Sequence, residues 1–129
     1  MPTIKYVLDA SAVLALLNNE PGEAIVKTLL PESVLNTINL AEVGAKLLEA
    51  GMSQTAAQVA VGVLGINQIV EFNKDLAWEA ARLRLLTKAN GLSLGDRACL
   101  ALAIRLDVHA VTADKEWAKL NLCSIMIIR

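Results

Sequence analysis

The sequence predicts an α/β domain with a mainly parallel central sheet that helices cover on both faces. Short apolar runs rich in β-branched residues alternate along the chain with longer helical segments. Strands separated by helices need crossover connections, which produce parallel strands. The 129 residues suit one domain over residues 1–129, and 55% of them are hydrophobic. A disordered chain is therefore excluded.

Five strands and seven helices are expected in this order. A strand over residues 4–8 precedes a helix over 12–17 that Ser11 opens, and a second helix covers 23–30. A strand over 33–37 precedes a helix that begins at Asn39 and ends at residue 50. Ser53 caps the next helix. The remaining strands are expected at 68–72, 108–112 and 124–128, and the remaining helices at 74–90, 94–106 and 114–120.

Residues 50–70 contain no charged side chain and are about as long as a membrane span. Their glycines and amide and hydroxyl side chains are too polar for hydrocarbon, so we expect a helix that is buried or faces a partner. No secretory signal is expected either, because Asp9 interrupts the apolar stretch near the N-terminus. Cys99 and Cys123 lack CxxC spacing and are expected to be buried, reduced thiols. We therefore expect a soluble, cytoplasmic protein with no membrane partner.

Composition restricts how the chain could bind nucleic acid. Aromatic residues make up only 3% of the sequence, which argues against stacking successive bases on aromatic side chains. The net charge is -1, so bulk positive charge does not attract a polyanion. Any nucleic-acid role must come from a local site.

Four acidic residues are expected at the carboxyl edge of the sheet. Asp9 directly follows the first strand, and Asp114 lies two residues after the fourth strand. Glu42 is expected in the first turn of the helix after the second strand, and Asp96 in the first turn of the helix that Ser93 caps. In parallel α/β sheets, groups that act on ligands lie at this edge.

Helix capping offers an alternative explanation for three of these acids. Asn39 with Glu42, and Ser93 with Asp96, have the spacing of a capping box. Asp114 would be an ordinary N-cap, and acids are favoured in a first helical turn. Taken one at a time, these acids do not require a functional explanation.

Asp9 is harder to explain by capping, because it follows an apolar strand that this topology places centrally. If the four acids converge to about 5 Å, each pair repels by about 3 kcal/mol at an effective dielectric constant near 20. Such a cluster needs raised pKa values or a cation. Mg²⁺ and Mn²⁺ prefer carboxylate oxygens, so metal-assisted hydrolysis of a phosphodiester is the expected chemistry.

Four stretches of the chain resemble the PIN-domain ribonucleases, and among them the VapC-type toxins of toxin–antitoxin pairs. The matching residues are 7–16 (VLDASAVLAL), 39–43 (NLAEV), 94–103 (LGDRACLALA) and 111–117 (VTADKEW). The resemblance implies a three-layer α/β/α sandwich in which Asp9, Glu42, Asp96 and Asp114 hold Mg²⁺ or Mn²⁺ for endonucleolytic cleavage of RNA. It also implies a homodimer and a cognate VapB-like antitoxin whose tail covers the site.

Residues beside the acids have two interpretations each. Ser11 could orient water or metal through its hydroxyl or act as an N-cap, and Thr112 could hydrogen-bond an acid. Arg97 and Lys115 could contact phosphate, or could be solvated or paired with an acid. His109 starts the fourth strand, at the opposite edge, and is not expected to act in catalysis.

A second class of function stays open beside the ribonuclease. A PIN-like domain could bind RNA or a protein partner without cutting, and the uncharged residues 50–70 would then supply a partner surface. Two other α/β enzyme classes are set aside. Haloacid-type phosphatases need an Asp where this chain has Ser11, and phospho-receiver domains need a Lys in the last strand, which has none.

Overall fold

The central sheet of the computed structural model, which describes residues 3–129, consists of five parallel strands in the order β3-β2-β1-β4-β5. The central strand is β1 (Tyr6–Leu8), which pairs with β2 (Ser33–Asn36) and with β4 (His109–Thr112). The outer strands are β3 (Gln68–Val70) beside β2 and β5 (Ile125–Ile127) beside β4. All five predicted strands are present, each shorter than expected, and the parallel pairing is confirmed.

Helices connect the strands and form the other two layers. In chain order they are α1 (Ala10–Leu17), α2 (Glu23–Leu29), α3 (Thr37–Glu49), α4 (Gln54–Gly62), α5 (Lys74–Thr87) and α6 (Leu94–Leu106). Three short 3₁₀ helices are η1 (Leu30–Glu32), η2 (Lys88–Asn90) and η3 (Lys115–Lys119). The predicted bounds of α6 agree with the structure at both ends.

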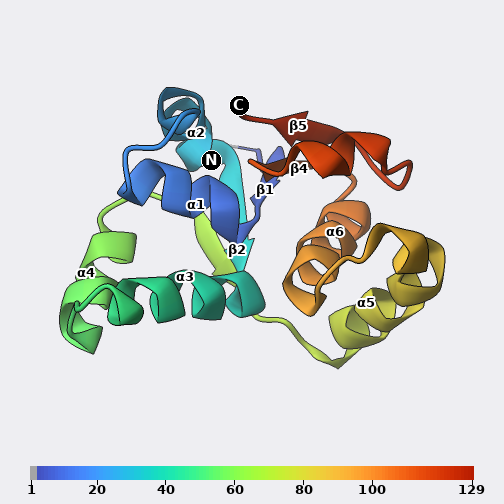
Figure 1. Cartoon of the computed structure of the whole chain (residues 1–129), viewed down its shortest axis with the longest axis horizontal. Helices are drawn as coiled ribbons and strands as arrows, with labels where there is room; N and C mark the ends of the chain where they lie inside the picture. Colours follow the sequence, from blue (N-terminus) through green and yellow to red (C-terminus); the bar gives the residue numbers. More distant parts are fainter. Residues whose placement is uncertain (1–2) are drawn as a thin grey trace.

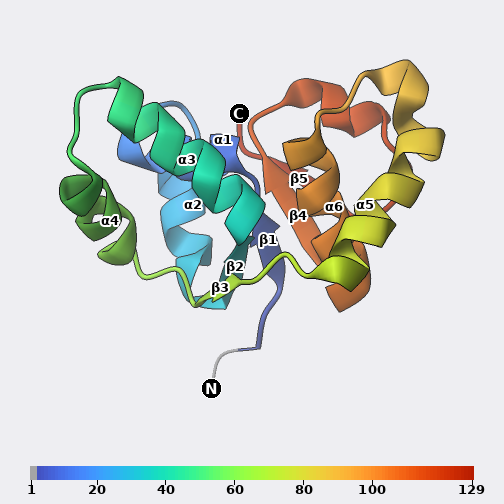
Figure 2. The same cartoon turned by 90° about the horizontal axis from the view of Figure 1, so that it is seen from below.

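Two hydrophobic cores lie on opposite faces of the sheet. One packs against α1 to α4 and the other against α5, α6 and η3, and both views show these helices on opposite sides (Figures 1 and 2). Neighbouring residues of one strand serve different cores, as side-chain alternation in a strand requires. Such pairs are Val7 and Leu8, Val34 and Leu35, and Ala110 and Val111. The three-layer α/β/α sandwich is confirmed.

Two helices begin earlier than the sequence predicts. The N-cap of α1 is Asp9 rather than Ser11, and the N-cap of α3 is Asn36 rather than Asn39. In each case the residue directly before the helix lies at the end of a strand, and its side-chain oxygen accepts hydrogen bonds from backbone amides of the first helical turn. Glu42 therefore lies in the second turn of α3, and the capping box expected between Asn39 and Glu42 does not form.

Residues 50–70 are expected to form a helix that is buried or faces a partner, and the structure rules out the first alternative. In α4 only Ala57 is buried, and Val59 is 58% exposed. The helix packs mainly against α3 and leaves its other faces open. In the described part of the chain, no helix combines the length and the hydrophobicity that a membrane crossing requires. That this segment faces a partner stays a prediction.

Candidate functional site

Asp9 lies at the carboxyl end of the central strand β1 and is only 5% exposed. Both oxygens of its carboxylate accept hydrogen bonds. The Ser11 hydroxyl donates to Oδ1 at 2.6 Å, the Ala12 amide donates to Oδ1 at 3.0 Å, and the Thr112 hydroxyl donates to Oδ2 at 2.7 Å. These donors from α1 and β4 fix the position of a charge that is almost removed from solvent.

The two hydroxyls also connect Asp9 to the residues that follow β4. Ser11 Oγ accepts from the Ala113 amide at 2.9 Å, and Thr112 Oγ1 accepts from the Asp114 amide at 3.0 Å. The Asp114 carboxylate itself accepts from the Glu116 amide at 2.9 Å and caps η3. Asp114 is therefore tied to Asp9 through its backbone, while its side chain has the capping role that the sequence allowed.

Asp96 is in the first turn of α6, where the expected capping box with Ser93 is confirmed. The Asp96 amide donates to Ser93 Oγ at 3.1 Å, and the Ser93 amide donates to Asp96 Oδ2 at 3.0 Å. The other oxygen, Oδ1, has no hydrogen-bond partner within the described residues 3–129. Capping therefore orients this carboxylate and leaves one of its oxygens for a ligand.

Glu42 reaches from α3 to the first turn of α6, where its carboxylate lies against Gly95. The side-chain amide of Asn39 donates to the Gly95 carbonyl at 3.1 Å, and the amide of Asn36 donates to Asn39 Oδ1 at 2.6 Å. Both asparagines are buried. Sequence reasoning missed Asn36, Asn39 and Gly95 as site residues. The available signals were two asparagines three residues apart after a strand and a glycine directly before Asp96.

The pKa values place three of the four acids in one electrostatic cluster. Burial raises the pKa of Asp9, the hydrogen bonds from Ser11, Thr112 and Ala12 oppose this rise, and the charge of Asp96 adds to it. Partial burial likewise raises the pKa of Glu42, and the charges of Asp96 and Asp9 raise it further. Asp114 does not contribute to either shift.

The donor chemistry of this cluster fits a hard divalent cation, because it offers carboxylate oxygens and no soft ligand. Across residues 3–129, no three Asp, Glu, His or Cys side chains lie close enough together, as they are placed in the structure, to hold a metal ion. An ion held here would therefore keep several water ligands, as Mg²⁺ ordinarily does. The absence of a side chain at Gly95 leaves the space that the Glu42 carboxylate occupies.

The structure changes the interpretation of Arg97 and supports that of His109. Arg97 donates through Nη1 to the Ala80 carbonyl of α5 at 2.9 Å, a contact that the expected alternatives of binding phosphate, pairing with an acid or facing solvent did not include. His109 is at the start of β4, where its ring stacks on Tyr6 with centroids 5.8 Å apart. Lys115 is exposed at the first residue of η3.

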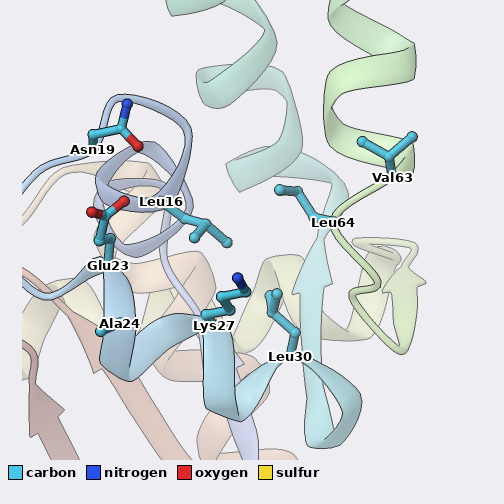
Figure 3. A pocket seen from close by; sticks show the side chains of 8 residues that line it. All are labelled: Leu16, Asn19, Glu23, Ala24, Lys27, Leu30, Val63 and Leu64. Atoms are coloured by element: carbon cyan, nitrogen blue, oxygen red, sulfur yellow. The ribbon is translucent and has the colours of Figure 1, made fainter.

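Two surface hollows lie away from the four acids. One of about 490 Å³ is lined by residues of α1, α2 and the segment after α4, with the Lys27 side chain between Leu16 and Leu30 (Figure 3). The other, of about 590 Å³, is an apolar groove between α3 and α4. Neither contains Asp9, Glu42, Asp96 or Asp114. The four acids therefore lie outside both hollows.

The family model of the PIN domain matches residues 6–121, which include all four acids. No curated protein matches the chain at a significant level.

Solved structures share the fold over nearly the whole chain. DNA-bound VapBC from Salmonella typhimurium is 14% identical, with a TM-score of 0.79 and coverage of 98% of this chain and 100% of that one. A toxin–antitoxin complex from Klebsiella pneumoniae is 18% identical, with a TM-score of 0.76 and coverage of 96% and 98%. VapC20 of Mycobacterium tuberculosis, a Sarcin-Ricin loop cleaving toxin, is 18% identical, with a TM-score of 0.72 and coverage of 88% and 92%.

Proposed function

The chain belongs to the PIN-domain family, and on this premise we propose that it is a metal-dependent endoribonuclease. The observation that carries the proposal is the cluster of Asp9, Glu42 and Asp96 at the carboxyl edge of the sheet. Burial and mutual repulsion raise the pKa of Asp9 and of Glu42, and a divalent cation would offset that repulsion. A local cation also explains how a chain with a net charge of -1 binds a polyanion.

Asp9, Glu42 and Asp96 would hold Mg²⁺ or Mn²⁺, and Asp114, two residues after β4, would complete the acidic set. When bound, such an ion neutralises charge on the phosphate and lowers the pKa of a coordinated water. In the reaction the water oxygen bonds to phosphorus, one phosphorus–oxygen bond of the RNA chain breaks, and the proton that the water loses is balanced by protonation of the departing sugar oxygen.

Hydrogen-bond donors and helix N-termini of the protein itself would help this edge of the sheet to bind the cation and the anionic RNA. Ser11 and Thr112 donate to Asp9 and favour its ionised form, which burial disfavours. The N-termini of α1 and α6 meet the acids, and their partial positive charge also favours the negatively charged backbone of RNA. Glu42 is exposed, so it would contribute an oxygen at a smaller cost of desolvation than the buried Asp9.

We further propose that the chain acts as the toxin of a type II toxin–antitoxin pair, with a VapB-like antitoxin as its partner and a homodimer as its assembly. The likeness to toxin–antitoxin complexes over 96% or more of this chain supports the partner proposal. The alternative is a module that binds RNA or a partner without cutting, and the exposed apolar side chains of α4 favour it.

A cleavage assay with matched variants tests the enzyme against this alternative. The purified chain is incubated with end-labelled RNA and Mn²⁺ or Mg²⁺, then with EDTA, and then as Asp9→Asn. Asp75→Asn is the control, since Asp75 is also an acid in the first turn of a helix but lies in α5. We expect products that EDTA and Asp9→Asn abolish and Asp75→Asn preserves.

Two other outcomes have distinct meanings. Cleavage that persists both in EDTA and in Asp9→Asn would contradict the proposed site. RNA binding without products under every divalent ion tested would favour the non-cleaving module.

A further inference from the structure

The contact between α3 and α6 depends on a glycine. Gly95 is the second residue of α6 and directly precedes Asp96. A Cβ built on Gly95 would overlap Glu42 Oε1 and would lie 2.5 Å from Glu42 Cδ. Any side chain at this position would therefore move the Glu42 carboxylate from its place beside Asp96.

A chain of buried amides fixes the same contact from the other side. Asn36 caps α3 with its side-chain oxygen and donates through Nδ2 to Asn39 Oδ1 at 2.6 Å. Asn39 then donates through its own Nδ2 to the Gly95 carbonyl at 3.1 Å. Because Asn36 and Asn39 are 0% and 1% exposed, water does not compete for these bonds. The first turn of α6 is therefore held against α3 at the level of Glu42.

We propose that Gly95 and Asn39 are positioning residues, which place the carboxylates of Glu42 and Asp96 so that both bind the same divalent cation. Gly95 acts by leaving space for Glu42, and Asn39 acts by holding the Gly95 carbonyl. The inference rests on the proposed function, because it assigns these residues to the cation site of the ribonuclease.

Stability measurements distinguish the positioning role from a purely structural role of Gly95, in which Gly95→Ala would destabilise the fold. Alanine is favoured over glycine inside a helix, and the atoms that its Cβ would meet are the far end of a flexible side chain. Gly95→Ala should therefore leave the metal-free domain as stable as wild type or more stable. Loss of cation affinity together with unchanged or higher Tm would separate positioning from packing.

The test compares wild type, Gly95→Ala, Glu42→Ala and the double variant by calorimetric titration with Mn²⁺ and by thermal unfolding in EDTA. We expect Gly95→Ala to weaken Mn²⁺ binding about tenfold or more, the size typical for residues that support metal ligands. In the Glu42→Ala background the same substitution should have no further effect, because no carboxylate remains to be displaced.

Gly44→Ala is the matched control, since Gly44 lies inside α3 and an added Cβ there meets nothing within 4 Å. It should leave the Mn²⁺ affinity unchanged. Asn39→Leu is a second variant, which keeps the size of the side chain and removes its donor to Gly95. It should lower Mn²⁺ affinity and kcat while the KM for RNA stays within about twofold, since a positioning residue does not touch the substrate.

Each result decides between the inference and its alternatives. Equal Mn²⁺ affinity in wild type and Gly95→Ala, or an equal loss in both Glu42 backgrounds, overturns the positioning role. A wild-type protein that cleaves RNA while Gly95→Ala retains full Mn²⁺ affinity refutes this inference alone. A wild-type protein that takes up no Mn²⁺ refutes the proposed function, and the inference with it.

Discussion

The acidic edge of the sheet consists of two corners that hold their charges in different ways. In the Asp9 corner (Asp9, Ser11, Thr112), three hydrogen-bond donors from two elements surround a carboxylate that is 5% exposed. In the α3–α6 corner (Asn39, Glu42, Gly95, Asp96), Glu42 has an exposed side chain whose position depends on the space at Gly95. Hydrogen bonds thus hold the carboxylates in both corners, and the position of Glu42 depends in addition on the space at Gly95.

The largest expected effect is on catalysis in the Asp9 corner. Asp9→Asn keeps the shape of the side chain and removes its charge, so the cation loses its most buried ligand. We expect kcat/KM for RNA cleavage to fall by more than about 100-fold, since groups that only support a metal ligand are worth 10- to 100-fold. A single-turnover assay with saturating Mn²⁺ measures this fall. A loss below tenfold would mean that the α3–α6 corner suffices.

Thr112→Val tests the hydrogen bonds of the Asp9 corner while the charge stays. The substitution removes the donor to Asp9 Oδ2 and the acceptor for the Asp114 amide. We expect a loss of about 1–3 kcal/mol in the free energy of unfolding and a 10- to 100-fold loss of cleavage. Urea unfolding and the cleavage assay measure the two effects.

Thr87→Val is the matched control for that variant. Thr87 is also buried, but its hydroxyl donates only to the Leu83 carbonyl of its own helix. This control should lose some stability and keep the cleavage rate of wild type. If both threonine variants lose cleavage equally, Thr112 acts only through stability.

Ser93→Ala tests the capping box in the α3–α6 corner. Loss of a serine N-cap costs about 1 kcal/mol, and here it also releases one of the two hydrogen bonds that orient Asp96. We therefore expect lower stability together with a several-fold weaker Mn²⁺ affinity. Ser53→Ala removes a similar cap from α4 and should cost similar stability with no change in Mn²⁺ affinity. Thermal unfolding and calorimetric titration compare the pair.

The smallest expected effect is a pH-dependent stabilisation of the metal-free protein by Asp9→Asn. The pKa of Asp9 is raised by folding, so the folded state binds its proton more tightly than the unfolded state and ionised Asp9 opposes folding. In EDTA at pH 7 the variant should therefore unfold at a higher temperature than wild type.

The gain should shrink as the pH falls through the raised pKa of Asp9, because wild type then takes up its proton. Thermal unfolding curves at several pH values from about 4 to about 8 check the sign of this change. A gain that grows toward acid pH would mean that the hydrogen bonds to Asp9 outweigh its burial.

The strands and most helices could be predicted because local pattern and global packing agree in them. In α6, the Ser93 cap and the apolar spacing locate both ends, and the parallel pairing follows from alternation of strand and helix. The start of α3 could not be located in this way. Asn36 and Asn39 are equally good caps by residue type, and only the end of strand pairing at Asn36 decides between them.

Sequence reasoning can nominate single residues of the candidate site, whereas it misses contacts between residues that are far apart in the sequence. Asp9 could be identified because a charge after a central strand is costly without partners. In the sequence, Gly95 is only a glycine that disfavours its helix. Its role depends on the Glu42 carboxylate, which lies against it in the fold but is 53 positions away in the sequence, so the local pattern around neither residue indicates the contact between α3 and α6. The contact of Arg97 with a backbone carbonyl of α5 could not be predicted for the same reason.

The shallow attachment of α4 has a consequence for how the molecule opens. Ala57 is the only residue of this helix that is buried, whereas seven residues of α6 are buried, so detaching α4 exposes little apolar surface. Segments with few buried contacts open at a free energy well below that of global unfolding. Backbone amides of α4 should therefore exchange with deuterium in the intact fold, long before those of α6, and protease nicking should begin around this helix.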